Sequence, residues 1–296
     1  MAGPSLSGLA RSQASLPAPL AGVSSATLYA LDGRGFAENA RVMLAAAGVR
    51  YEEVAVETRA QREALFANPS EELGLPPGVL GPPLAMQLPL LVLRYASSET
   101  QPVPPDALSG GIRAAAGSNS EESVLCVASA GAIVRHLARA CGLYGDGEQE
   151  AARIDMLAEG VGQLCSRFVA LPFASVPLAA LHGDDDWRDP VAELRARHLD
   201  TVLPQLERVL AVNDASQTMG WLVGARMSYV DILLTEVVEY VQEYCPGTAD
   251  DYPLLRALWQ RVRGKPRLKA FFDGDDGHRK PPSGRHYVAT VRAVMG

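Results

Sequence analysis

The feature that most constrains the fold is a change in periodicity near Gly145. Before this point, short apolar runs typical of strands alternate with amphipathic stretches typical of helices. After it, the pattern predicts helices over nearly all of residues 148–296. A small sheet whose strands alternate with helices is covered by those helices. The sequence therefore predicts an α/β domain followed by an all-helical domain.

The α/β part has the element order βαβ and then ββα. Strands are expected at 26–31, 49–56, 88–93 and 124–128, and helices at 36–47, 59–67 and 130–141. Two of these helices stop at Gly48 and Gly142, as expected because glycine readily adopts the left-handed conformation that ends many helices. Residues 95–122, which are rich in Ser, Pro and Gly, predict an exposed insertion.

The helical part contains six predicted segments. They span residues 148–171, 191–212, 228–244, 253–262, 266–272 and 285–295. Ser228 and Asp231 have the spacing of a capping box, in which a serine caps the helix and an acid lies in its first turn. The sequence therefore predicts that the third of these helices begins at this pair.

Residues 1–25 contain one charged residue, Arg11, among many Ser, Ala, Leu and Pro residues. Such a composition cannot bury a core, so a flexible tail is expected. We expect a cytoplasmic protein. The alternative is an organellar location if residues 1–25 act in targeting, although transit peptides are normally rich in arginine.

Composition excludes several classes of function. The 27 Lys and Arg residues are outnumbered by 34 Asp and Glu residues, and the resulting formal charge of −7 argues against nucleic-acid binding. No apolar run approaches the roughly 18 residues of a membrane span. The four cysteines form no CxxC pair and the five histidines show no ligand spacing, so no metal site is expected.

Several short motifs follow one another in an order that is typical of one family. They are Arg34-Gly35, the LAAAGV stretch at 44–49, Gln87-Leu88-Pro89, the GWLVG stretch at 220–224, and Tyr252-Pro253-Leu254-Leu255. With these motifs the chain resembles the cytosolic glutathione transferases of the alpha, mu, pi and sigma branch. The RKPP stretch at 279–282 and the helix after it look most like the alpha and sigma classes.

The resemblance covers residues 26–94 and 123–296 and implies a thioredoxin-like domain followed by an all-α domain. Accordingly, we expect a tail at 1–25, a thioredoxin-like domain at 26–144 that carries the insertion 95–122, and a helical domain at 148–296. The resemblance also implies that glutathione is a co-substrate and that a hydrophobic electrophile is the second substrate.

In this branch a tyrosine late in the first strand donates a hydrogen bond to the glutathione sulfur. The matching position, four residues before the Arg34-Gly35 pair, is Ala30. Tyr29 is the neighbouring residue, but successive strand residues point to opposite faces of a sheet. Tyr29 is thus the candidate catalytic residue only if a one-residue bulge turns it towards the site. Otherwise the activating hydroxyl is missing.

The resemblance also assigns residues that hold glutathione. The backbone of Leu88, before a cis Pro89, would pair with the cysteinyl unit, with Gln87 beside it, and Ser129 would meet the γ-glutamyl carboxylate at a helix N-terminus. Arg34 is a candidate charge partner, as are Arg59 and Arg62. The acid that family members contribute across a dimer is replaced by Gln163, and their aromatic dimer key by Ala85.

Two functions remain open at this point. The first is a glutathione transferase with weakened catalysis, in which Tyr287, Val288, Val291 and Val294 of the last helix form a lid over the electrophile. The second is a non-catalytic binding or structural subunit, in a dimer or in a heteromeric complex formed through the insertion 95–122. The departures at the glutathione site favour the second, and the expected fold favours the first.

Overall fold

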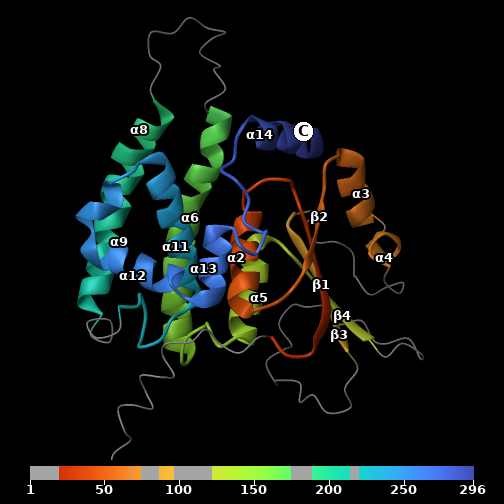
Figure 1. Cartoon of the computed structure of the whole chain (residues 1–296), viewed down its shortest axis with the longest axis horizontal. Coiled ribbons are helices and arrows are strands. Elements are labelled where there is room, and N and C mark those ends of the chain that lie inside the picture. The colour runs from red at the N-terminus through yellow and green to blue at the C-terminus, as the bar shows by residue number, and fades with distance from the viewer. Residues whose placement is uncertain (1–19, 68, 75–86, 97–121, 175–188, 214–219) are drawn as a thin grey trace, which may run out of the picture. The chain divides into compact units, whose positions relative to one another are not determined.

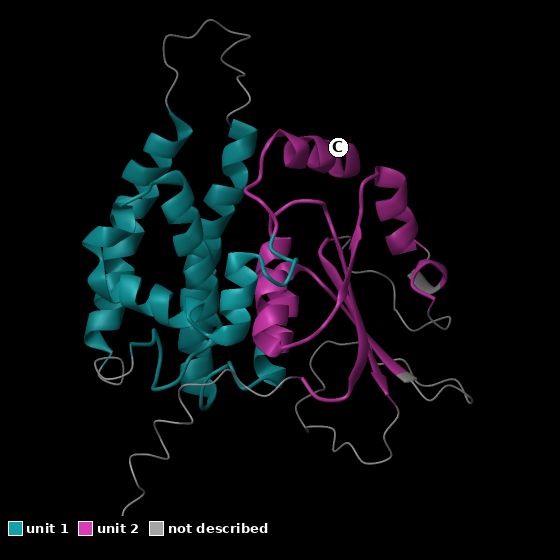
Figure 2. Cartoon of the chain, viewed as in Figure 1, with its two compact units in different colours: residues 1–17, 138–279 teal, residues 18–137, 280–296 magenta. Residues whose placement is uncertain are grey.

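The computed structural model describes residues 20–67, 69–74, 87–96, 122–174, 189–213 and 220–296 (Figure 1). The chain divides into two compact units (Figure 2). The sheet unit comprises residues 18–137 and 280–296, and the described part of the helical unit lies within residues 138–279. The last helix of the chain therefore belongs to the sheet unit.

Four strands form the sheet in the order β2-β1-β3-β4. They are β1 (Val23–Ala30), β2 (Glu52–Ala55), β3 (Leu90–Ala96) and β4 (Glu122–Ala128). β1 runs parallel to β2 and antiparallel to β3, which is itself antiparallel to β4. Because Leu90 lies opposite both Tyr29 and Ala128, the ends of β1 and β4 meet the start of β3 at one end of the sheet.

Helices cover both faces of this sheet (Figure 1). α2 (Ala37–Ala47) and α5 (Ala130–Ala140) lie on one face, where Leu28 and Ala30 are fully buried. α3 (Arg59–Ala67) and α14 (Arg285–Met295) lie on the other, while α4 (Pro69–Glu72) is a single turn after α3. Phe66 of α3 and Val294 of α14 share an apolar cluster with strand residues on this second face. Successive side chains of β1 point to opposite faces of the sheet, so they pack against the two helix layers in turn.

The helical unit is built around α11 (Tyr229–Tyr244), whose residues 229–238 are all buried. The other elements are α6 (Glu148–Ala174), α8 (Pro190–Leu194), the π-helical turn η1 (Arg195–Leu199), α9 (Asp200–Val212), the 3₁₀ turn η2 (Thr248–Asp251), α12 (Pro253–Arg263) and α13 (Pro266–Asp273). The predicted helix 191–212 is therefore interrupted by η1, a feature that apolar periodicity does not indicate.

The predicted capping box at the start of α11 is confirmed. The buried Asp231 carboxylate accepts hydrogen bonds from the backbone N–H of Leu222 at 2.9 Å and of Ser228 at 2.7 Å, and from the Ser228 hydroxyl at 2.9 Å. Burial raises the pKa of Asp231 to about 6, even though these donors favour the ionised form. The carboxylate thus joins the loop before α11 to the helix itself.

Replacing Asp231 by asparagine is expected to lower the free energy of unfolding by about 1–2 kcal/mol at neutral pH, because the amide has one acceptor oxygen for three donors. The pKa is higher in the folded protein than in the unfolded chain, so the carboxyl contributes less stability as the pH rises from about 4 to about 6. The stability difference between the two proteins, measured by urea unfolding, should therefore shrink over that range and stay constant above it. A difference that grows with pH would contradict this assignment.

Three predicted boundaries differ from the structure. β1 begins at Val23, inside the predicted tail 1–25, because Val23 pairs with Tyr95 and Ser25 pairs with Arg94 of β3. The pairing of β3 with β4 extends to Ala96 and Glu122, which moves the ends of the predicted insertion 95–122 into the sheet. The rest of the insertion, residues 97–121, and residues 1–19 lie outside the described residues.

The third difference concerns the C-terminal segment 280–296, which was expected in the helical domain 148–296. Its contacts explain why it belongs to the sheet unit instead. Arg34 donates to the backbone carbonyl of Lys280, and Val294 packs in the apolar cluster on the α3 face of the sheet. Arg59 of α3 donates to the carbonyl oxygen of Gly296 at 2.8 Å.

Candidate functional site

The structure brings Leu88, Pro89 and Ser129 together where β3 begins and β4 ends. We call these three residues the strand-end site. The Leu88–Pro89 peptide bond is cis, and the backbone N–H of Ser129 donates to the carbonyl of Pro89 at 2.9 Å. Pro89 is buried, Leu88 is half-buried, and the neighbouring Gln87 is exposed. The site is therefore made largely of backbone and is fixed by the strand pairing next to it.

Ser129 has an unusual backbone conformation. Its φ of 75° is left-handed, the only such value at a non-glycine position among the described residues. An N-cap residue normally has an extended backbone, so an ordinary cap does not account for Ser129. Such conformations cost roughly 1–3 kcal/mol and are concentrated at functional sites. Ser129 immediately precedes α5, whose first N–H groups lack intrahelical partners and favour a bound carboxylate.

Tyr29 and Ala30 lie on opposite faces of the sheet. The pairing of β1 with β2 is regular through both residues, and the one register shift of β1 lies between Val23 and Ser25. The bulge that would have turned Tyr29 is therefore absent. Ala30 is fully buried on the α2 face, whereas Tyr29 packs against the apolar cluster on the α3 face.

The surroundings of Tyr29 are those of a sheet residue. Burial raises the pKa of its hydroxyl, and the positive charge of Arg94 opposes this effect. Cys126, whose thiol pKa is raised by burial to about 11, packs against the same cluster as Tyr29. A hydroxyl with a raised pKa is a weaker hydrogen-bond donor to an anionic sulfur, so this environment does not activate Tyr29.

The three candidate arginines hold the C-terminal segment. Arg34 is almost fully buried, and its Nε and Nη2 atoms both donate to the Lys280 carbonyl at 3.1 Å. Arg59 forms an exposed ion pair with Glu63 at 2.7 Å in addition to its bond to Gly296. Arg62 donates to the sulfur of Met295 at 3.2 Å. Each of them thus has a structural partner within the sheet unit.

Sequence analysis missed a buried ion-pair network that fixes the loop between β1 and α2. The Arg41 guanidinium is fully buried and pairs with Glu38 and Glu53, each at 2.8 Å. It also donates to the carbonyls of Gly33 at 3.0 Å and Arg34 at 3.2 Å. Burial is the largest effect on Glu53 and opposes its ionisation, but the hydrogen bonds from Arg41 and the positive charges of Arg41 and Lys280 together outweigh burial and lower the pKa of this carboxyl. The spacing of Glu38 and Arg41 on one helix was the available signal, whereas the pairing with Glu53 required the fold.

The remaining predicted positions lie elsewhere. Gln163 is exposed on α6 of the helical unit, and Ala85 lies outside the described residues. Within the described ranges, no group of three or more His, Cys, Asp or Glu side chains could hold a metal ion. Within the same ranges, no helix is long and apolar enough to cross a membrane.

The described architecture is that of a thioredoxin-like sheet unit with a separate helical unit. Comparison with known proteins agrees with this class. Residues 178–275 match the family model described as glutathione S-transferase, C-terminal domain. A pi-class glutathione S-transferase structure from Onchocerca volvulus superposes with a TM-score of 0.59 at 22% identity, covering 88% of this chain and 98% of that one.

Curated relatives extend over most of the chain. Glutathione S-transferase 3 of Gallus gallus is 30% identical over 268 residues, which is 90% of this chain and 93% of that protein. Glutathione S-transferase alpha-4 of Rattus norvegicus is 29% identical over 268 residues, 90% of this chain and 96% of the relative. The chain therefore belongs to the glutathione S-transferase family, and the predicted fold class is confirmed.

Proposed function

We propose that this protein binds glutathione at the strand-end site and conjugates it to electrophiles only slowly. The observation that carries the proposal is Ala30, which is fully buried at the position where the family resemblance places a tyrosine. The strand-end site supports binding, because it offers backbone groups and a helix N-terminus. Without the tyrosine hydroxyl that Ala30 replaces, the site lacks a donor to the glutathione sulfur, and conjugation is slow.

Binding would use mainly backbone groups, which persist in any replacement except one by proline. The cysteinyl backbone of glutathione would pair with the backbone of Leu88 as an added strand. The γ-glutamyl carboxylate would lie at the N-terminus of α5, beside Ser129. The pairing of β1, β3 and β4 fixes Leu88, Pro89 and Ser129 before the ligand arrives, so little ordering entropy opposes binding.

Catalysis requires the thiolate form of glutathione, because a free thiol with a pKa near 8.5 is a poor nucleophile. A hydrogen bond to a charged group contributes about 1.5–3 kcal/mol. Its loss corresponds to a rise of roughly one to two units in the thiol pKa. At neutral pH the bound thiolate would fall to about a tenth to a hundredth of the amount in a site with the hydroxyl.

The second candidate is a non-catalytic binding or structural subunit. It is favoured by the use of Arg34 to hold the C-terminal segment and by the placement of Tyr29 on the α3 face. In that case the protein acts through a dimer or a heteromeric partner that contacts the insertion 95–122. A cytoplasmic location fits both candidates, and an organellar one requires targeting by residues 1–25.

Two measurements separate the candidates. Calorimetric titration with glutathione tests binding, and conjugation of an aryl halide tests catalysis. We expect micromolar to millimolar binding with a turnover at least tenfold below that of an active family member. Binding without turnover would leave the second candidate. Leu88→Pro removes the backbone N–H that the strand-like pairing uses and is the negative control for binding. Absence of glutathione binding by the parent protein would overturn the proposal.

Replacing Tyr29 by phenylalanine is expected to leave kcat/KM for conjugation within about twofold of the parent value. Tyr29 lies on the α3 face, where the positive charge of Arg94 acts on its hydroxyl, whereas Ala30 lies on the opposite face. Steady-state kinetics against an aryl halide measures the effect. A loss of tenfold or more at constant glutathione affinity would show that Tyr29 acts on the sulfur.

A further inference from the structure

A hollow of about 280 Å³ lies in the helical unit between the last turns of α6 and the start of α8. We call it the α6–α8 hollow. Small and apolar side chains form much of its wall, with Ala170, Leu171 and Ala174 on α6 and Pro190 and Leu194 on α8. The two sides are joined in sequence by residues 175–188, which lie outside the described residues.

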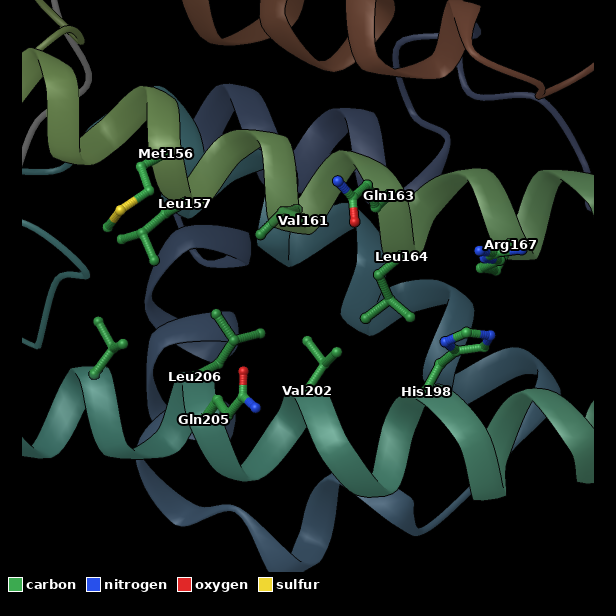
Figure 3. A pocket seen from close by; sticks show the side chains of 12 residues that line it. Met156, Leu157, Val161, Gln163, Leu164, Arg167, His198, Val202, Gln205 and Leu206 are labelled. Atoms are coloured by element: carbon green, nitrogen blue, oxygen red, sulfur yellow. The ribbon is translucent and has the colours of Figure 1, made fainter.

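The hollow has more donors than acceptors among its charged side chains. These are Arg167 of α6, Glu193 of α8, and Arg197 and His198 of η1. Glu193 pairs with Arg197 at 3.0 Å, so these two charges offset each other. Figure 3 shows the side chains of Arg167 and His198 at the same end of the space between α6 and α9. Within the part of the chain that the structure describes, neither of these two side chains has a hydrogen bond or an ion pair.

The local backbone accounts for the position of His198. It lies in the π-helical turn η1, which interrupts the α-helical hydrogen-bond pattern between α8 and α9. Arg197 and His198, which are neighbours in this turn, both line the hollow. π turns are rare and often occur at functional sites. The interruption that apolar periodicity does not indicate thus adds two polar side chains to a largely apolar wall.

Both ends of the connection between α6 and α8 lie at the hollow. Ala174 lines it, and Asp189 directly precedes Pro190, which lines it as well. The sequence of the connection contains a run of three aspartates, Asp184–Asp186. An extended chain spans at most about 3.6 Å per residue, so the members of the run can be at most about 11–18 Å from Asp189. The run can therefore reach the hollow.

We propose that the run Asp184–Asp186 docks in the α6–α8 hollow and that its carboxylates pair with Arg167 and His198. Charge favours this occupant, because the hollow has donors in excess and the run supplies only acceptors. The short connection to α8 also favours it. A segment tethered this closely has an effective concentration of about millimolar, whereas a separate partner loses translational and rotational freedom on binding. The result is a salt-sensitive internal contact that occupies both donors.

Trp187 follows the aspartate run directly and reports on it. The difference between the parent protein and Trp187→Phe isolates its fluorescence from that of Trp221, which is buried, and of Trp259, which is half-buried. Acrylamide is a suitable quencher because it is neutral. The quenching constant of Trp187 is expected to rise about twofold between low salt and about 1 M salt, because salt screens the ion contacts. It should not depend on protein concentration, because the contact lies within one chain.

Arg167→Gln and His198→Gln test the donors. Each is expected to raise the quenching constant of Trp187 at low salt by about twofold and to reduce its salt dependence, since each removes one partner of the run. Arg153→Gln on α6 and Arg208→Gln on α9 are matched controls, because both arginines are exposed and neither lines the hollow. In the controls the quenching constant should equal that of the parent protein.

A variant with the three aspartates of the run replaced by asparagine tests the acceptors. It should show the higher quenching constant at low salt, and adding Arg167→Gln should not raise this constant further, because both changes remove the same contact. A short poly-aspartate peptide tests whether the hollow is already occupied. It should bind the asparagine variant about tenfold more tightly than the parent protein, in which the tethered run competes with it. Unchanged circular dichroism shows that each variant is folded.

Four results would overturn the proposal. One is a quenching constant for Trp187 that is the same at low and at high salt. Another is an equal change of this constant in Arg153→Gln and Arg167→Gln. A third is equal affinity of the poly-aspartate peptide for the parent protein and the asparagine variant, since the hollow would then be open to an acidic partner. The fourth is protection of Trp187 that increases with protein concentration, since a second copy of the chain would then supply the occupant.

Discussion

Replacing Arg41 by methionine is expected to lower the free energy of unfolding by about 3–5 kcal/mol, the usual result of breaking a buried ion pair from one side. The side chain of Glu38 is 1% exposed and that of Glu53 is 12% exposed, so neither carboxylate can regain its hydration. The carbonyls of Gly33 and Arg34 lose a donor as well. Urea unfolding followed by circular dichroism measures the effect.

The matched control is Arg197→Met, which removes an exposed pair with Glu193 and should cost less than about 1 kcal/mol. Adding Glu38→Gln and Glu53→Gln to Arg41→Met should recover about half of the loss, because the unpaired negative charges are then gone. A loss below about 1 kcal/mol for Arg41→Met alone would mean that the ion pairs that remain, Lys280 with Glu53 at 3.3 Å and Arg34 with Glu38 at 4.0 Å, are enough to stabilise the two carboxylates.

The Arg41 network shows what sequence periodicity can and cannot predict. A helix was expected at 36–47 because this stretch is rich in helix-forming residues and Gly48 ends it, and the observed helix is Ala37–Ala47. The charged residues Glu38 and Arg41 on that helix are normally taken as solvated. They are buried because β2 brings Glu53 against them and the C-terminal segment covers the loop before the helix. Both partners are distant in sequence, so local patterns carry no signal for them.

The local structure of the strand-end site could be predicted from the sequence, because it depends on residues that are neighbours in the chain. The cis bond before Pro89 and the start of α5 after Ser129 are each specified by a few neighbouring residues. The left-handed conformation of Ser129 was not expected, because nothing in its residue type requires it. The pairing of Leu90 with both Tyr29 and Ala128 holds this end of the sheet together, and strand register is a tertiary property.

Because the C-terminal segment 280–296 belongs to the sheet unit, its helix α14 has a different role from the one expected. Its apolar residues were expected to form a lid, yet Val294 packs with the sheet and Tyr287 is buried against the loop between β1 and α2. The loop contains Gly33 and Gly35, both with positive φ. Lys280 pairs with Glu53 at 3.3 Å and with Asp32 at 3.5 Å at the start of the same segment. The segment is thus part of the sheet unit's core and fixes the loop that precedes α2.

Replacing Gly35 by alanine is expected to lower the free energy of unfolding by about 2–5 kcal/mol. The φ of Gly35 is 45°, a conformation that costs an alanine roughly 1–2 kcal/mol. The added Cβ would also overlap the Tyr287 hydroxyl, and its distance to Cζ of that ring would be only 2.7 Å. Displacing the ring adds an overpacking cost of about 1–3 kcal/mol.

Two variants separate the backbone cost from the steric cost. Gly74→Ala has a similar φ of 59° but open space around the added Cβ, so it should cost about 1–2 kcal/mol. In a Tyr287→Ala background, Gly35→Ala should cost the same as Gly74→Ala, because the ring that it strikes is gone. The double-mutant cycle should therefore show a coupling of about 1–3 kcal/mol between the two positions. Additive effects would show that Tyr287 does not pack on Gly35 in solution, and that the C-terminal segment does not hold this loop.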